Sequence, residues 1–191
     1  MIEKLEKIGW FENFPLELQK DTVSVIQWSV NHGYDTLAPP VAYSLDYESI
    51  DRDEPYGTVI RGFSEASHGI FQPENINEQY NRIGEHGGEF VISFVNNGIP
   101  YSITIPHESD WLHPSFFVFL DRVMDDTGTG LRFIDLNSLK ADGDQTGDFI
   151  LANPQAFVQA AQNKLITYYE YKYDGERGKW IPRNPYEPLN P

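Results

Sequence analysis

The chain has 191 residues, of which 40% are hydrophobic and 14% aromatic, so it can bury the core of one domain and is not a disordered chain. It contains no cysteine, which excludes disulfide bonds, thiolate zinc sites and cysteine nucleophiles. The formal net charge of −15 argues against binding to nucleic acid or anionic membranes and favours a basic protein partner, although solubility alone also accounts for it.

The acidic residues are spread over most of the chain. The net charge is −7 for residues 1–56, −5 for residues 57–110 and −4 for residues 111–163, whereas residues 164–191 carry +1. No stretch approaches the roughly 18 apolar residues of a membrane span, and the N-terminus lacks a basic start followed by an apolar run. We therefore expect a cytoplasmic protein with no membrane segment.

The first third of the chain is predicted to be helical. A short helix is expected within residues 2–11, and a longer one follows, since Asn13 can cap it, Pro15 suits its first turn and Gly33 can end it. Leu18, Val25 and Trp28 recur at helical spacing, with Thr22 and Ile26 nearby, which predicts one buried face. The Pro39–Pro40 pair then interrupts regular structure.

The middle of the chain contains a predicted β-hairpin. The β-branched residues 57–63 predict a short strand, and the polar, glycine-ended residues 73–88 predict a loop with at most one helical turn. In residues 89–105, apolar residues alternate on both arms (Phe90, Ile92, Phe94; Tyr101, Ile103, Ile105). Asn97–Gly98 between the arms suits a type I′ turn.

The last part alternates helices and strands. We expect helices at residues 114–126 and 154–165, with strands at 131–136 and 149–152 joined by the loop 141–148. Residues 166–173 fit either a final strand or a continuation of the helix. The fold class is therefore predicted as α+β: a single domain over residues 1–175, with a mostly antiparallel sheet and three or four helices, and a proline-rich extended tail at 176–191.

The segment PHESDWLH, residues 106–113, gathers two histidines and two acids between the hairpin and a helix. His107 and His113 are six residues apart, which is not the usual spacing of a metal pair. His113 precedes a proline, which favours an extended backbone and suits it to the cap region, and Ser109 or Asp110 can accept N–H groups where the helix begins. Trp111 and Leu112 can fasten the start of the helix to the core. We interpret the segment as a structural joint.

Two other patterns resemble reactive sites incompletely. Residues 62–66, GFSEA, lack the second glycine of a hydrolase nucleophile elbow, although a triad built from Ser64, His86 and a glutamate stays open, as does a role for His68. Residues 142–153 match the pattern of a calcium-binding loop only in part. Thr146 stands where the pattern has an Asp or Asn ligand, and Asn153 stands where it has the final glutamate. We therefore expect no metal and no cofactor.

Three stretches resemble the immunity proteins of bacterial polymorphic-toxin and contact-dependent inhibition systems. They are EFVISFVNNGIPYSITIP (89–106), DWLHPSFFVFLDRVM (110–124) and LRFIDLNSLKADGDQTGDFILANPQAFVQAAQ (131–162), so the resemblance covers about residues 88–163. It is a pattern of elements rather than a diagnostic motif. It implies a non-enzymatic protein of bacterial competition that binds one cognate toxin, often a basic nuclease, and blocks it. No functional residue is carried over from this group.

Charge and resemblance together predict a toxin inhibitor that acts by stoichiometric occlusion. Acidic clusters speed the capture of a basic partner, and buried aromatic residues near the centre slow its release. The candidate partner-binding residues are Asp125, Asp126, Asp142, Asp144, Asp148, Asp51, Asp53 and Glu54. A small hydrolase using dispersed Ser, His and acidic residues, and an acidic structural or adaptor domain, are the alternatives.

Overall fold

The computed structural model describes residues 1–32, 42–48, 54–83, 87–135 and 146–166, together with the backbone of two strands at 170–174 and 179–183. Its fold class is α+β, as predicted. The chain packs as two compact units, one made of residues 1–44 and 131–191 and the other of residues 45–130. The predicted boundary between a domain and a tail at residue 176 stays a prediction.

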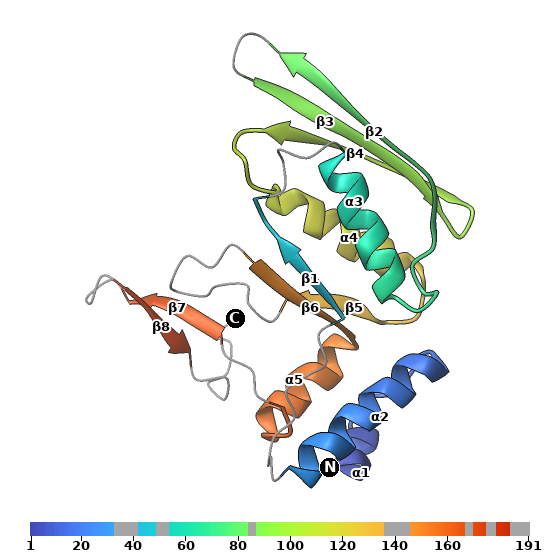
Figure 1. The fold of residues 1–191 in the computed structure, drawn as a ribbon, viewed down its shortest axis with the longest axis vertical. Helices are drawn as coiled ribbons and strands as arrows, with labels where there is room; N and C mark the ends of the chain where they lie inside the picture. The colour runs from blue at the N-terminus through green and yellow to red at the C-terminus, as the bar shows by residue number, and fades with distance from the viewer. Residues whose placement is uncertain are drawn as a thin grey trace. The chain divides into compact units, whose positions relative to one another are not determined.

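The unit of residues 45–130 is a three-stranded sheet covered by two helices. The sheet has the strand order β2-β3-β4, formed by β2 (Pro73–Ile83), β3 (Gly87–Asn96) and β4 (Ile99–His107), and its neighbouring strands are antiparallel. The helices α3 (Pro55–Ala66) and α4 (Pro114–Asp126) lie on one side of it (Figure 1). Their apolar faces and the sheet enclose an aromatic core that includes Tyr56, Phe63, Phe71, Phe90, Phe94, Phe116 and Phe119.

The hairpin β3–β4 confirms the strongest sequence prediction. Along β3 the side chains alternate between buried and partly exposed, with Phe90, Ile92 and Phe94 toward the helices. Asn97 and Gly98 form the turn, and both have positive φ angles, of 51° and 77°. A type I′ turn requires positive φ at both central residues, so these two residue types specify the register of the hairpin.

The predicted strand at residues 57–63 is wrong, because these residues lie within helix α3. Pro55 occupies the first helical turn, and the buried residues Tyr56, Val59, Ile60 and Phe63 recur at helical spacing. Glu78 on β2 caps the helix from outside: its carboxylate oxygens accept the N–H groups of Gly57 at 2.7 Å and Tyr56 at 3.4 Å. The β-branched composition that predicted a strand is overridden by this tertiary cap and by packing.

The predicted loop at residues 73–88 is also wrong, because residues 73–83 form β2, the edge strand of the sheet. Its residues pair with β3 over nearly the whole length, with a register shift between Glu74 and Asn77. Most of its side chains are exposed, so the polar composition that predicted a loop is compatible with an edge strand.

The other unit contains α1 (Ile2–Lys7), α2 (Leu16–Asn31) and α5 (Pro154–Gln162), with the sheet order β1-β6-β5. The strands are β1 (Tyr43–Asp46), at which the unit boundary falls, β5 (Arg132–Asp135) and β6 (Thr146–Ala152). One cluster joins all three helices to β6 and contains Leu5, Trp10, Ile26, Ile150, Ala156, Phe157 and Ala160.

Most predicted elements of this unit are confirmed. Helices are present where residues 2–11, 13–33 and 154–165 predicted them, and Asn153 caps α5 by accepting the N–H groups of Gln155 and Ala156. Trp28 departs from the prediction: it is 55% exposed and stacks on His32, with 4.2 Å between ring centroids. Gly33 and Pro39–Pro40 lie outside the described residues.

The C-terminal region contains an antiparallel pair, β7 (Glu170–Asp174) and β8 (Lys179–Arg183). Of the two alternatives for residues 166–173, the strand is therefore observed over residues 170–173. β8 falls within the stretch expected to be an extended tail, of which residues 184–191 lie outside the described part.

Candidate partner-binding surface

The predicted partner-binding acids are distributed between the two units. Asp125 and Asp126 are exposed at the C-terminal end of α4, and Glu54 is the N-cap residue of α3, where its carboxylate pairs with Arg61 at 3.0 Å. Asp148 belongs to the other unit and accepts the Ser44 hydroxyl at 2.7 Å. The remaining four, Asp51, Asp53, Asp142 and Asp144, lie outside the described residues.

Asp126 is held in place by the neighbouring strand. Tyr101 on β4 donates its hydroxyl to Asp126 Oδ2 at 3.0 Å. Burial, together with the negative charge of Asp126, raises the pKa of Tyr101, so the phenol stays protonated and keeps donating. Two carboxylates at a helix C-terminus are unfavourable for the helix dipole, and this hydrogen bond offsets part of that cost.

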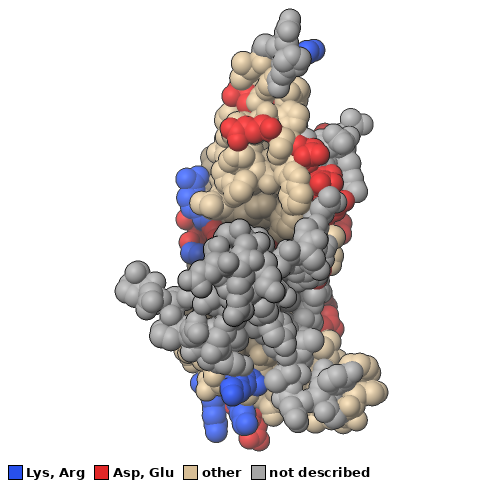
Figure 2. Space-filling view, turned by 90° about the vertical axis from the view of Figure 1, so that its left-hand side faces the viewer, with Lys and Arg blue, Asp and Glu red and all other residues tan. Residues whose placement is uncertain are grey.

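The negative charge is concentrated on residues 45–130. This unit carries 4 basic and 15 acidic residues, a net of −11, whereas the rest of the chain carries 10 and 14, a net of −4. All four basic residues are arginines, and the chain has no lysine between Lys20 and Lys140. The upper part of Figure 2, which shows this unit, has separate acidic side chains standing among uncharged ones.

Three aromatic side chains of the same unit form what we call the aromatic patch: Tyr47, Trp111 and Phe117. The rings of Tyr47 and Trp111 are nearly parallel, with 6.4 Å between their centroids, and Phe117 meets Tyr47 edge-on at 5.7 Å. Trp111 is 41% exposed. Sequence reasoning assigned Trp111 to the core and did not single out Tyr47 or Phe117. One feature of the sequence could have drawn attention to Tyr47 and Trp111 as surface aromatic residues: each stands directly beside an acidic residue.

The segment 106–113 forms the joint that the sequence predicted, and of the residues expected in the cap region His113 is the one that caps the helix. His113 is the N-cap of α4, and its Nδ1 accepts the N–H of Ser115 at 3.2 Å. Ser109 accepts the N–H of Trp111 instead. His107 has a different hydrogen-bond partner: its Nδ1 is 3.1 Å from the Tyr80 hydroxyl. The two histidines therefore serve separate local structures.

The serines considered for a hydrolase bond to the backbone. The hydroxyls of Ser64 and Ser67 both donate to the carbonyl of Phe71, at 3.0 and 3.1 Å, and Ser67 is fully buried. His68 is exposed and has a positive φ of 51°. His86 lies outside the described residues. These serines fix the turn after α3.

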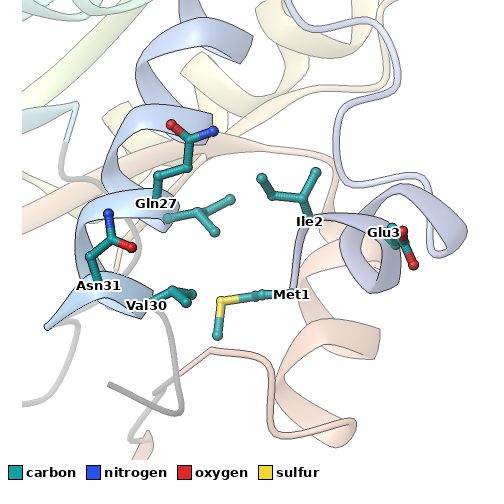
Figure 3. A pocket seen from close by; sticks show the side chains of 7 residues that line it. Met1, Ile2, Glu3, Gln27, Val30 and Asn31 are labelled. Carbon is teal, nitrogen blue, oxygen red and sulfur yellow. The ribbon is translucent and has the colours of Figure 1, made fainter. Parts of the chain in front are cut away.

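A hollow of about 440 Å³ lies between α1 and α2. Figure 3 shows Met1, Ile2 and Val30 directed toward it, whereas the carboxylate of Glu3 points away. Its lining thus brings no set of ionisable groups to one point. Over the described ranges, His, Asp and Glu side chains form no group of three suited to a metal ion.

Comparisons with known proteins identify no relative. The chain matches no protein-family model, and no curated protein or solved structure matches it either. Within the part of the chain that the structure describes, no helix combines the length and apolar character needed to cross a membrane.

Proposed function

We propose that the protein is an immunity- or inhibitor-type protein of bacterial competition, which binds a basic toxin domain in the cytoplasm and neutralises it by stoichiometric occlusion. The observation that supports this most is the net charge of −11 on residues 45–130. A field of this sign speeds the encounter with a basic protein and repels nucleic acid, so it favours capture of the protein rather than of its substrate.

The proposed mechanism needs no bond-making by this chain. Carboxylates such as Asp125 and Asp126 are exposed at the end of one helix, where they can orient a basic partner during approach. The aromatic patch then supplies the apolar contact that slows dissociation. Once bound, the inhibitor blocks access to the toxin's active site in a one-to-one complex.

The test is capture of a partner from a lysate of the source strain on the immobilised full-length protein. We expect a basic protein to be retained at about 50 mM NaCl and released at about 500 mM, because the Debye length falls severalfold over this range. The recovered protein should bind with one-to-one stoichiometry, and its expression should kill bacteria unless this chain is co-expressed. If no basic protein is retained at low salt, or the retained one is harmless, the proposal fails.

A further inference from the structure

One buried indole in the unit of residues 1–44 and 131–191 lacks a hydrogen-bond partner. Trp10 is 2% exposed, and its Nε1–H reaches no acceptor in the part of the chain that the structure describes. The residue is fixed from two directions: its backbone N–H donates to the Leu5 carbonyl at 3.0 Å, and its ring packs on Phe157 with 6.2 Å between centroids. Native cores satisfy nearly all of their buried polar groups, so this N–H group points to a ligand.

Trp10 lines a small cavity that has the size of one water molecule. About 10 Å³ of it is open to the centre of a water molecule, and a buried water needs roughly 10–15 Å³ by this measure. All seven lining residues lie in the described part of the chain, none of them is charged, and only Trp10 and Thr22 have polar side chains. This volume excludes larger molecules, and an uncharged lining does not suit an ion.

Thr22 supplies the second polar side chain of the cavity. It lies on α2, is 1% exposed, and donates its hydroxyl to the Leu18 carbonyl at 2.8 Å. Because its proton is used in this way, the Thr22 oxygen can only accept a further hydrogen bond, whereas an indole N–H can only donate one. A ligand shared by the two side chains must therefore accept from Trp10 and donate to Thr22. Water does both.

We propose that the cavity is a hydration site, in which one buried water accepts the Trp10 Nε1–H and donates to Thr22 Oγ1. A chain of three hydrogen bonds then runs from the indole through the water and the Thr22 hydroxyl to the Leu18 carbonyl, and each bond polarises the next. The water thereby connects the turn after α1 to α2. The inference goes beyond the proposed function and is independent of it, since the site lies outside residues 45–130.

The test is nuclear magnetic resonance of the isotope-labelled full-length protein, with the indole N–H signal of Trp10 identified by its loss in Trp10→Phe. We expect this signal to show a cross-peak at the water frequency that changes sign between laboratory-frame and rotating-frame experiments. Such a change identifies a bound water and distinguishes it from chemical exchange of the N–H proton. Trp28, whose side chain is 55% exposed, is the reference for surface water and should show no bound-water cross-peak.

Three variants test the second contact of the water. Thr22→Val replaces the hydroxyl with a methyl group of similar size and should abolish the Trp10 cross-peak, whereas Thr22→Ser keeps the hydroxyl and should retain it. Ser24→Ala is the matched control, because Ser24 also donates to a carbonyl four residues earlier on α2, at 2.9 Å, but is exposed. It should leave the cross-peak unchanged.

The inference is overturned if the wild type shows no bound-water cross-peak at Trp10, or if Thr22→Val and Ser24→Ala leave the same intensity. Dispersed amide signals show that each variant is folded. Should Thr22→Val not fold, the wild-type spectrum still decides, because a dry cavity gives no cross-peak. None of these outcomes changes whether a basic toxin is captured, so the two proposals fail separately.

Discussion

Glu78 connects two elements through a single partly buried carboxylate. It accepts backbone N–H groups at the start of α3, whose own N-cap residue, Glu54, has a left-handed backbone and makes no side-chain cap. Burial raises the pKa of Glu78; the N–H groups of Gly57 and Tyr56 and the charge of Arg61 oppose that shift, and the charge of Glu54 adds to it. The Glu78 carboxylate therefore caps the helix at a cost in free energy, because its charged form is partly removed from water.

The raised pKa of Glu78 predicts how stability responds to pH. The folded state holds the proton more tightly than the unfolded state, so this residue's contribution to stability is present below about pH 4.5 and declines as pH rises through the raised pKa. The Glu78→Gln variant lacks this titration. We expect its free energy of unfolding in urea to improve relative to wild type between pH 4 and pH 7. Glu74→Gln, on an exposed part of the same strand, is the control, and an equal response in both variants would contradict the assignment.

At this scale the sequence predicts the role and narrows it to a few residues. The cap region before α4 was expected to involve Ser109, Asp110 or His113, and His113 is the N-cap residue. The residue before a proline favours an extended backbone, and here His113 has φ −71° and ψ 135°, which place its Nδ1 on the N–H of Ser115. A side chain that is seldom a cap can thus act as one where the backbone is suitable.

Elements were predictable where local signals agreed and were missed where a tertiary contact decided. The hairpin and helix α4 combine turn residues, a first-turn proline and a clear period, and both lie where predicted. Residues 55–66 contain strand-forming residues but become a helix because Glu78, more than ten residues away in sequence, caps it. β2 is a strand because β3 offers it a partner, which its own polar composition does not reveal.

The hairpin turn yields a prediction about Gly98. Its φ is 77°, and no atom lies within 4 Å of a Cβ placed there, so a substitution meets backbone strain and no steric contact. Gly98→Ala should lower the free energy of unfolding by about 1–2 kcal/mol, the cost of a left-handed conformation for a residue with a Cβ. Asn97→Gly, at the adjacent positive φ, should be nearly neutral. Chemical denaturation measures both, and an equal loss in the two variants would rule out the type I′ account.

For the whole molecule, the sequence shows the net charge but not how it divides between compact units. Counting by segment gave an even spread of acids, whereas the fold collects residues 45–130 into one unit of −11. The aromatic patch was equally hidden, because Tyr47 and Trp111 are 64 positions apart in sequence and meet only in the folded chain. Long-range proximity of this kind has no local signature.

The same charge should affect stability. Like charges crowded into one compact unit repel each other, and added salt screens that repulsion. We expect the midpoint of thermal unfolding to rise by a few degrees between about 10 and 300 mM NaCl, as a gain on the order of 1 kcal/mol would produce in a chain of this size. Differential scanning calorimetry measures this shift. A midpoint that falls over the same range would indicate that attractive ion pairs dominate instead.

The absence of lysine between Lys20 and Lys140 has a practical consequence. Reagents that attack amines, such as activated-ester dyes and immobilisation resins, have no side chain to modify anywhere in residues 45–130. Protein tethered or labelled in this way therefore presents its most acidic unit, with the indole of Trp111, chemically unaltered to whatever binds it. Any dye that this chain takes up on a lysine therefore reports from outside residues 45–130.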